Sequence, residues 1–100
     1  MPALAPSLLL TLSNTWIKIC GITQHGDALA ACELGADAIG LVFYPPSPRS
    51  VSVRQIDAIV RDLPANICVV ALFVDPTVEV VKQVIATGMI DLLQFHGEET

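Results

Sequence analysis

A thiol and an ammonium group lie two residues apart in the segment KICGIT at residues 18–23. Side chains alternate along a β-strand, so Lys18 and Cys20 share one face of the strand that this segment predicts. A nearby cation favours the thiolate over the thiol, which makes Cys20 a candidate base or nucleophile. A cysteine among isoleucines is also typical of a small packing residue, so the spacing alone leaves both interpretations open.

Further polar side chains follow the other predicted strands, at the point where each strand ends. Arg49 lies in the loop after the second strand, Asp75 ends the third, and Gln94 and His96 share a face of the fourth. Ligands of parallel sheets and barrels bind beyond these carboxyl ends. Each residue also has a structural interpretation: Asp75 as a helix cap, and Lys18 as a charge that reaches solvent. Together, a cation, a thiol and an imidazole at one rim suit an anionic substrate that undergoes proton transfer.

Strand-like and helix-like segments alternate along the chain. The expected strands are residues 16–20, 37–44, 67–74 and 90–95, and the expected helices are residues 27–34, 53–63 and 77–87. The middle helix is specified by a capping box of Ser52 with Gln55 and a hydrophobic staple of Val51 with Ile56. The last helix is predicted to start at an N-cap Asp75 before a proline. Its expected inward residues are Val78, Val81, Val84 and Ile85.

This order of elements predicts βαβ units and a parallel sheet. The acidic residues that follow Gly97 resemble the first turn of a further helix. A complete flavodoxin-like sheet would finish on a helix or a covered edge, whereas this chain stops with a helix barely begun. We therefore expect an α/β fold of the (β/α)8 TIM barrel family, truncated to about the first four βα units, a half barrel.

The composition supports an incomplete or partnered domain. Of the 100 residues, 53% are hydrophobic and 15% are charged, and a small domain leaves a large share of its surface exposed. The apolar surface therefore calls for a partner, a second copy or the missing part of a larger domain. A net charge of −5, with five scattered basic residues, argues against a nucleic-acid partner.

The cysteines and the N-terminus bear on location and cofactors. Three cysteines without CxxC spacing suit a reducing compartment, so the cytoplasm is expected. Residues 1–15 lack a basic signal region and are expected to be a loose N-terminal extension before a domain at 16–100. No apolar run approaches a membrane span. Neither metal-ligand spacing nor a glycine-rich phosphate loop is present in the sequence, so no cofactor is expected.

Several segments, in order and spacing, resemble the phosphoribosylanthranilate isomerase family of tryptophan biosynthesis. They are KICGIT at 18–23, DA at 27–28, GADAIGLVF at 35–43, SPR at 47–49, VALFV at 70–74 and LQFHGEE at 93–99. The resemblance covers residues 16–99 and corresponds to the first four units of the family's (β/α)8 barrel.

The resemblance implies a catalyst that converts N-(5-phosphoribosyl)anthranilate to 1-(2-carboxyphenylamino)-1-deoxyribulose 5-phosphate. It implies Cys20 as the general base, Arg49 facing the anthranilate carboxylate, and His96, Lys18 and Gln94 as further substrate-binding residues. The general acid and the phosphate site are expected in the absent second half, which is the expected partner. The alternative is a non-catalytic half barrel that self-associates or serves as a ligand-binding module, because exposed sheet edges need cover.

Overall fold

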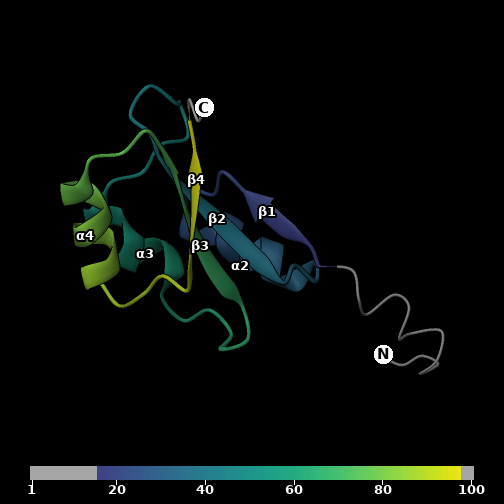
Figure 1. Cartoon of the computed structure of the whole chain (residues 1–100). Helices are drawn as coiled ribbons and strands as arrows, with labels where there is room; N and C mark the ends of the chain where they lie inside the picture. The colour runs from purple at the N-terminus through teal and green to yellow at the C-terminus, as the bar shows by residue number, and fades with distance from the viewer. Residues whose placement is uncertain (1–15, 98–100) are drawn as a thin grey trace.

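The computed structural model describes residues 16–97, which form a four-stranded parallel sheet and its helices (Figure 1). The strands are β1 (Lys18–Cys20), β2 (Ala38–Phe43), β3 (Cys68–Val74) and β4 (Leu92–His96), and they lie in this order across the sheet. The helices are α2 (His25–Glu33), the 3-10 turn η1 (Val53–Gln55), α3 (Ile56–Val60) and α4 (Val78–Ala86). The predicted parallel α/β arrangement is confirmed. The predicted N-terminal extension and the final helical turn lie outside the described residues.

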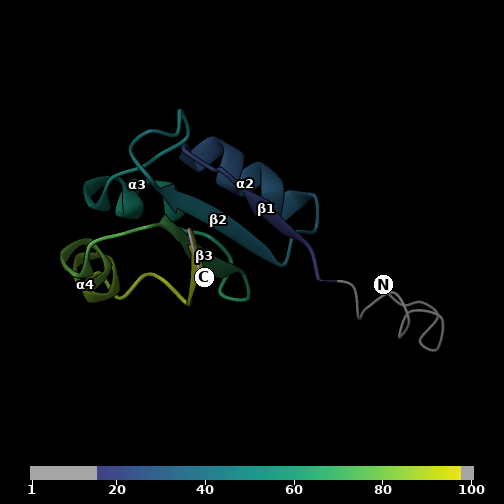
Figure 2. The ribbon, with the colours of Figure 1, turned by 45° about the horizontal axis from the view of Figure 1, so that its top comes forward.

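One face of the sheet is covered by helices and holds the core (Figure 2). In β2 and β3, the first, third and fifth residues after the start of the strand point toward the helices. The residues between them point to the opposite side of the sheet, as a period of two requires. The covered strand residues are Ile39, Leu41, Phe43, Val69, Ala71 and Phe73, and they pack with residues of all three α-helices. We call the opposite side the open face of the sheet.

Two aspartates stabilise the register of the sheet by accepting hydrogen bonds from backbone N–H groups. The Asp37 carboxylate accepts a hydrogen bond from the Ile17 N–H at 2.9 Å, and the Asp91 carboxylate accepts one from the Val69 N–H at 2.8 Å. Each aspartate precedes a strand and binds the backbone at the start of the strand that comes before it in the chain. The β1–α2–β2 and β3–α4–β4 units are therefore fastened in the same way.

The helix signals around Ser52 are confirmed, although the first turn is tighter than expected. The Ser52 N–H donates to Gln55 Oε1 at 2.7 Å, completing one side of the capping box. The turn that follows is 3-10, and α3 ends at Val60 rather than at residue 63. Val51 and Ile56, the two residues of the predicted staple, are both buried in the core.

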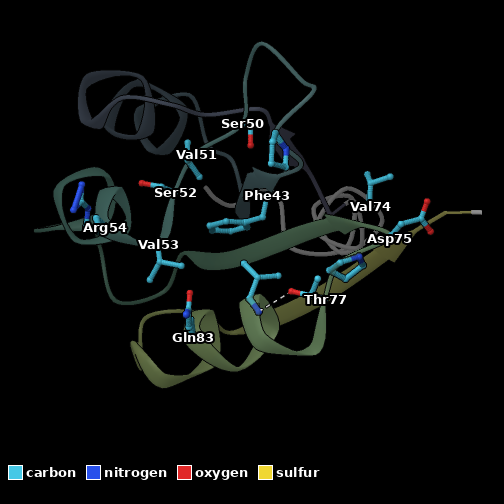
Figure 3. Close-up of a pocket in the computed structure, with 13 residues that line it drawn as sticks. Phe43, Ser50, Val51, Ser52, Val53, Arg54, Val74, Asp75, Thr77 and Gln83 are labelled. Atoms are coloured by element: carbon cyan, nitrogen blue, oxygen red, sulfur yellow. Dashed lines mark hydrogen bonds between the residues drawn. The ribbon is translucent and has the colours of Figure 1, made fainter.

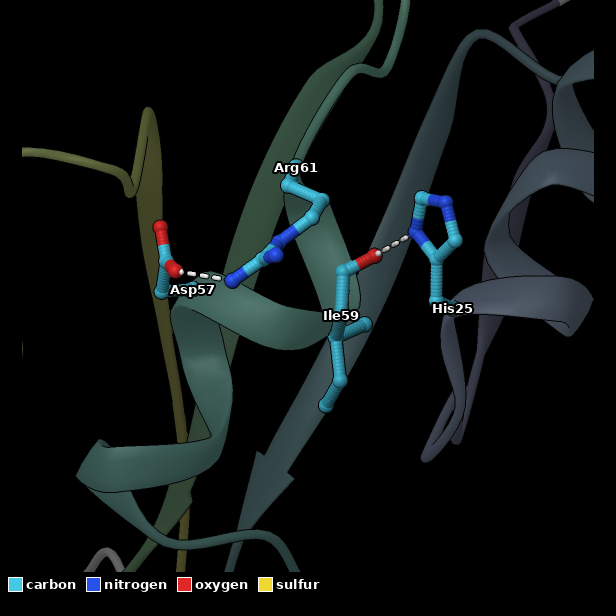
Figure 4. A network of polar contacts seen from close by, with 4 residues as sticks. All are labelled: His25, Asp57, Ile59 and Arg61. Carbon is cyan, nitrogen blue, oxygen red and sulfur yellow. Dashed lines mark hydrogen bonds and ion pairs between the residues drawn. The ribbon is translucent and has the colours of Figure 1, made fainter.

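Helix α2 starts two residues earlier than predicted, and a histidine there joins it to α3. His25 donates its Nδ1–H to the Ile59 carbonyl oxygen at 3.0 Å (Figure 4). Figure 4 also shows the exposed ion pair between Arg61 and Asp57, 2.7 Å apart on and just after α3. An exposed pair of this kind contributes little to stability, whereas the histidine contact ties two helices together.

The predicted start of the last helix was wrong. Thr77, not Asp75, is the N-cap of α4, because its hydroxyl accepts from the Val80 N–H at 3.2 Å. Asp75 instead takes a left-handed conformation, with φ of 45°, which an aspartate tolerates better than most residues. The chain thereby turns sharply before the helix begins.

This start also sets which face of α4 is buried. Val84 is fully buried and Val80 and Val81 pack against the core, whereas Val78 and Ile85 are 71% and 53% exposed. Two of the four residues predicted to point inward therefore face solvent. The inward stripe lies at 80, 81 and 84, a spacing that places three residues on one side of a helix.

Strand β4 leaves apolar side chains uncovered. Leu92, Leu93 and Phe95 are 50%, 37% and 49% exposed, and among residues 16–97 only β3 pairs with this strand. The exposed strand is thus an edge that additional structure would cover.

No helix that the structure describes is long and apolar enough to cross a membrane.

Substitution of two of the four valines in α4 tests the orientation of the helix. Val84→Ala is expected to lower the free energy of unfolding by roughly 2 kcal/mol, because it removes fully buried methyl groups and leaves a cavity. Val78→Ala is expected to change it by less than about 0.5 kcal/mol, because the side chain is exposed. Urea unfolding followed by circular dichroism measures both. Equal effects of the two substitutions would contradict the orientation.

Candidate active site

The thiol of Cys20 lies at the end of β1, exposed on the open face. Ile19 packs against the core on the other side, so Lys18 and Cys20 share the open face as predicted. Cys20 pairs with Gly40 in the sheet. A Cβ atom at Gly40 would stand 2.7 Å from the Cys20 Sγ. Because Gly40 has no side chain, it leaves room for the Cys20 thiol.

Arg49 reaches the same rim from the loop after β2. Its Cδ would stand 2.9 Å from a Cβ atom placed on Gly21, directly after Cys20. Gly21 also has φ of +86°, a left-handed conformation that side chains disfavour. Both the close approach of Arg49 and the left-handed backbone thus require a glycine at position 21. Without a side chain there, the Arg49 side chain can lie beside the end of β1, next to Cys20.

Lys18, Gln94 and His96 form a connected set across the open face. The Lys18 ammonium donates a hydrogen bond to the Gln94 side-chain oxygen. The Gln94 Nε2 lies 3.3 Å from His96 Nε2. Since β1 and β4 are the two outer strands of the sheet, this contact requires the sheet to curve so that its outer strands face each other.

Asp75 also reaches this rim, by a route that its role as a predicted cap did not suggest. Its N–H donates to the His96 carbonyl oxygen at 3.1 Å. Its side chain covers Gly97, where a Cβ atom would stand 2.2 Å from Oδ1. Asp75 therefore links the end of β3 to the end of β4, through its backbone and its side chain.

The other two cysteines occupy different surroundings. Both Cys32, on α2, and Cys68, on the open face of β3, are half-buried. Burial raises the pKa of each thiol above its ordinary value, with a smaller contribution from Glu33 for Cys32 and from Asp91 for Cys68. Their thiolates therefore form less readily than that of a free cysteine.

A separate cavity lies between the η1 region and α4 (Figure 3). It has a volume of about 530 Å³ and a largely apolar lining that includes Phe43, Val53 and Val80. Of the predicted site residues and Asp75, only Asp75 lines it. The cavity is on the helix side of the molecule, so it is distinct from the rim that carries the thiol.

Sequence reasoning missed the two glycines that shape the rim. Gly40 interrupts an otherwise apolar strand, a signal for close approach of another group. Gly21 follows the thiol directly. Within residues 16–97, no group of three or more histidine, cysteine or acidic residues is arranged to hold a metal ion.

Comparison with known proteins decides the family. Residues 17–100 match the model of the N-(5'-phosphoribosyl)anthranilate (PRA) isomerase family. The chain belongs to this family. PRA isomerases from Azotobacter vinelandii and Nitrosococcus oceani are 57% identical over 83 residues and 55% identical over 87 residues. The chain spans about 40% of the length of these relatives (40% and 42%).

Solved structures of PRA isomerases agree with this assignment. The enzyme from Thermotoga maritima superimposes with a TM-score of 0.79 and 41% identity, covering 86% of this chain and 42% of its own. The Thermus thermophilus enzyme gives a TM-score of 0.77 and 37% identity over 86% and 43% of the two chains. The four strands thus match half of the PRA isomerase (β/α)8 barrel, as the sequence predicted.

Alkylation tests the difference among the three thiols. At neutral pH, iodoacetamide is expected to modify Cys20 at least several-fold faster than Cys32 or Cys68, because only Cys20 is exposed. The raised pKa of the other two places their thiolates at higher pH, so their rates should approach that of Cys20 only above the ordinary thiol range of about 8.5. Mass spectrometry of timed digests measures the three rates. A Cys20→Ser variant should lose the fast phase, and fast labelling that persists in it would refute the assignment.

Proposed function

We propose that this chain supplies the base-bearing half of a PRA isomerase active site. The proposed reaction converts N-(5-phosphoribosyl)anthranilate to 1-(2-carboxyphenylamino)-1-deoxyribulose 5-phosphate. The observation that carries the proposal is the exposed Cys20 thiol beside Gly40 at the strand rim of a chain that belongs to this family. A related PRA isomerase has been solved with the reduced form of this product bound, which supports the substrate class.

The reaction needs two proton transfers. An acid protonates the ribose ring oxygen as the ring opens, and a base removes the proton from C2′, leaving an enolamine that relaxes to the aminoketone. Cys20, as thiolate, takes the C2′ proton. In the last step C1′ gains a proton and the 2′-hydroxyl group loses one, so that substrate and product have the same composition. No electrons leave the substrate, so no redox cofactor is required.

Two side chains of the rim suit the anionic substrate. Arg49 can bind the anthranilate carboxylate with its planar fork of N–H donors. His96, on β4, offers a hydrogen-bonding group on the far side of the open face. The acid and the phosphate site are assigned to the part of the relatives that this chain does not match.

The open face explains why the remaining half is needed. Lys18 and Gln94 cross a face that no described helix covers, and both edge strands lack an outer neighbour among residues 16–97. Further strands paired with β4 would cover Leu92 and Phe95 and enclose the rim. We therefore take the second half of the barrel as the chief partner.

Free thiols at all three cysteines suit the cytoplasm as the site of action.

A chimera tests the proposal. Residues 17–100 are joined to the unmatched C-terminal part of the Azotobacter vinelandii relative, and product is measured by chromatography. We expect conversion by the chimera and none by the 100-residue chain. Cys20→Ala in the chimera should lower kcat/KM by about 10²- to 10⁴-fold, the usual contribution of a general base.

Cys32→Ala and Cys68→Ala serve as matched controls. Each removes a thiol that lies in a half-buried position, and each should leave the rate within a few-fold of the unaltered chimera. A chimera that is folded, as shown by cooperative unfolding, yet lacks activity would contradict the proposal. Full activity without the Cys20 thiol would remove Cys20 from its role as base.

The exposed apolar strand favours a second candidate function. Leu92, Leu93 and Phe95 are uncovered along β4, and two copies of the chain could shield these edges in a self-associating, non-catalytic half barrel. Sedimentation equilibrium of the 100-residue chain measures this directly. A stable dimer together with an inactive chimera would favour this function over the isomerase, whereas a monomer would exclude self-association.

A further inference from the structure

The contacts of Gln94 place it between a cation and an imidazole. Its side-chain oxygen accepts a hydrogen bond from the Lys18 ammonium, and its Nε2 faces His96 Nε2 at 3.3 Å. Lys18 is on β1 and the other two residues are on β4. The set therefore links the outer strands of the sheet by side chains alone.

The chemistry of these groups allows one orientation of the amide. A lysine ammonium has three donors and no acceptor, so only the amide oxygen of Gln94 can face Lys18. The amide NH2 group must then face His96. A flipped amide would set donor against donor at Lys18, which makes the lysine the group that fixes the orientation.

The orientation of Gln94 in turn decides the tautomer of His96. An amide N–H donates, so His96 Nε2 must accept, and an accepting ring nitrogen carries no proton. The proton of the neutral imidazole therefore resides on Nδ1. The backbone of His96 is held as well, because its carbonyl oxygen accepts from the Asp75 N–H at 3.1 Å.

We propose that Lys18 and Gln94 are positioning residues that hold His96 as the Nδ1–H tautomer. The family resemblance implies substrate binding for both residues, and in the structure they are bound to each other and, through Gln94, to His96. His96 then offers its Nδ1–H to an oxygen atom of the ligand. This last role rests on the proposed function, but the tautomer itself does not.

Nuclear magnetic resonance of the 100-residue chain tests the tautomer without any activity. Long-range ¹H–¹⁵N spectra distinguish the protonated ring nitrogen from the bare one, at a pH about two units above the ordinary histidine pKa of ~6.5. The expected result is Nδ1–H for His96. His25 is an internal reference, because its Nδ1 faces the Ile59 carbonyl oxygen and must also carry a proton. A His25→Gln variant assigns the two rings.

Three substitutions should have different effects on the tautomer of His96. Lys18→Arg keeps a donor-only cation and should preserve Nδ1–H. Lys18→Met removes the group that orients the amide and should give a mixture of tautomers. Gln94→Glu supplies only acceptors, so His96 should transfer its proton to Nε2 and donate to the carboxylate. His25 should not respond to any of them, which shows that each variant is folded.

Two results of these spectra would contradict the proposal. Nε2–H in the unaltered chain, or an unchanged tautomer in both Lys18→Met and Gln94→Glu, would overturn the proposal. In the chimera, Lys18→Met should raise KM and Lys18→Arg should restore it, because a misplaced donor weakens binding. Spectra that meet the expectation in an inactive chimera would retain the tautomer and reject the isomerase.

Discussion

The register of the parallel sheet determines where every candidate functional side chain lies. Along each strand, one residue enters the helix-covered core and the next faces the open side, so a shift of one position would exchange the two sets. The carboxylates of Asp37 and Asp91 bind backbone N–H groups of the neighbouring units and oppose such a shift. In this register Cys20 lies opposite Gly40, and Lys18 lies two positions earlier on the same face. The site thus depends on backbone pairing that the two aspartates secure.

Small residues and hydrogen bonds make a polar open face compatible with this sheet. Gly40 and Gly21 provide space for a thiol and a guanidinium chain that larger residues would displace. Lys18 is half-buried, a costly position for an unpartnered charge, and the Gln94 oxygen satisfies it. The same contact that lowers the cost of a half-buried cation also orients the amide toward His96. Stability and site geometry therefore share one interaction.

Local signals in the sequence predicted local structure well. The capping box of Ser52 with Gln55, for example, is formed by residues near one another in the chain. The error at α4 arose because Asp75 and Thr77 are both capable N-caps, and the sequence does not show that the Asp75 backbone is bound to β4. Lys18, Gln94 and His96 do meet, yet the pairing of Lys18 with Gln94 depends on the curvature of four strands. Strand alternation places these residues on a face but cannot reveal that curvature.

The aromatic rings on the helix side show how the remaining half would extend the same packing. Phe43, Phe73 and Phe95 stack in sequence across three strands, with ring centroids 5.4 Å apart in each pair. Phe73 is fully buried between its neighbours, whereas Phe95, at the end of the row, is 49% exposed. A fifth strand and the helix before it would cover Phe95 as β4 covers Phe73. Because that strand would pair along β4, it would also extend the open face beside His96, so one addition would extend both the core and the rim of the site.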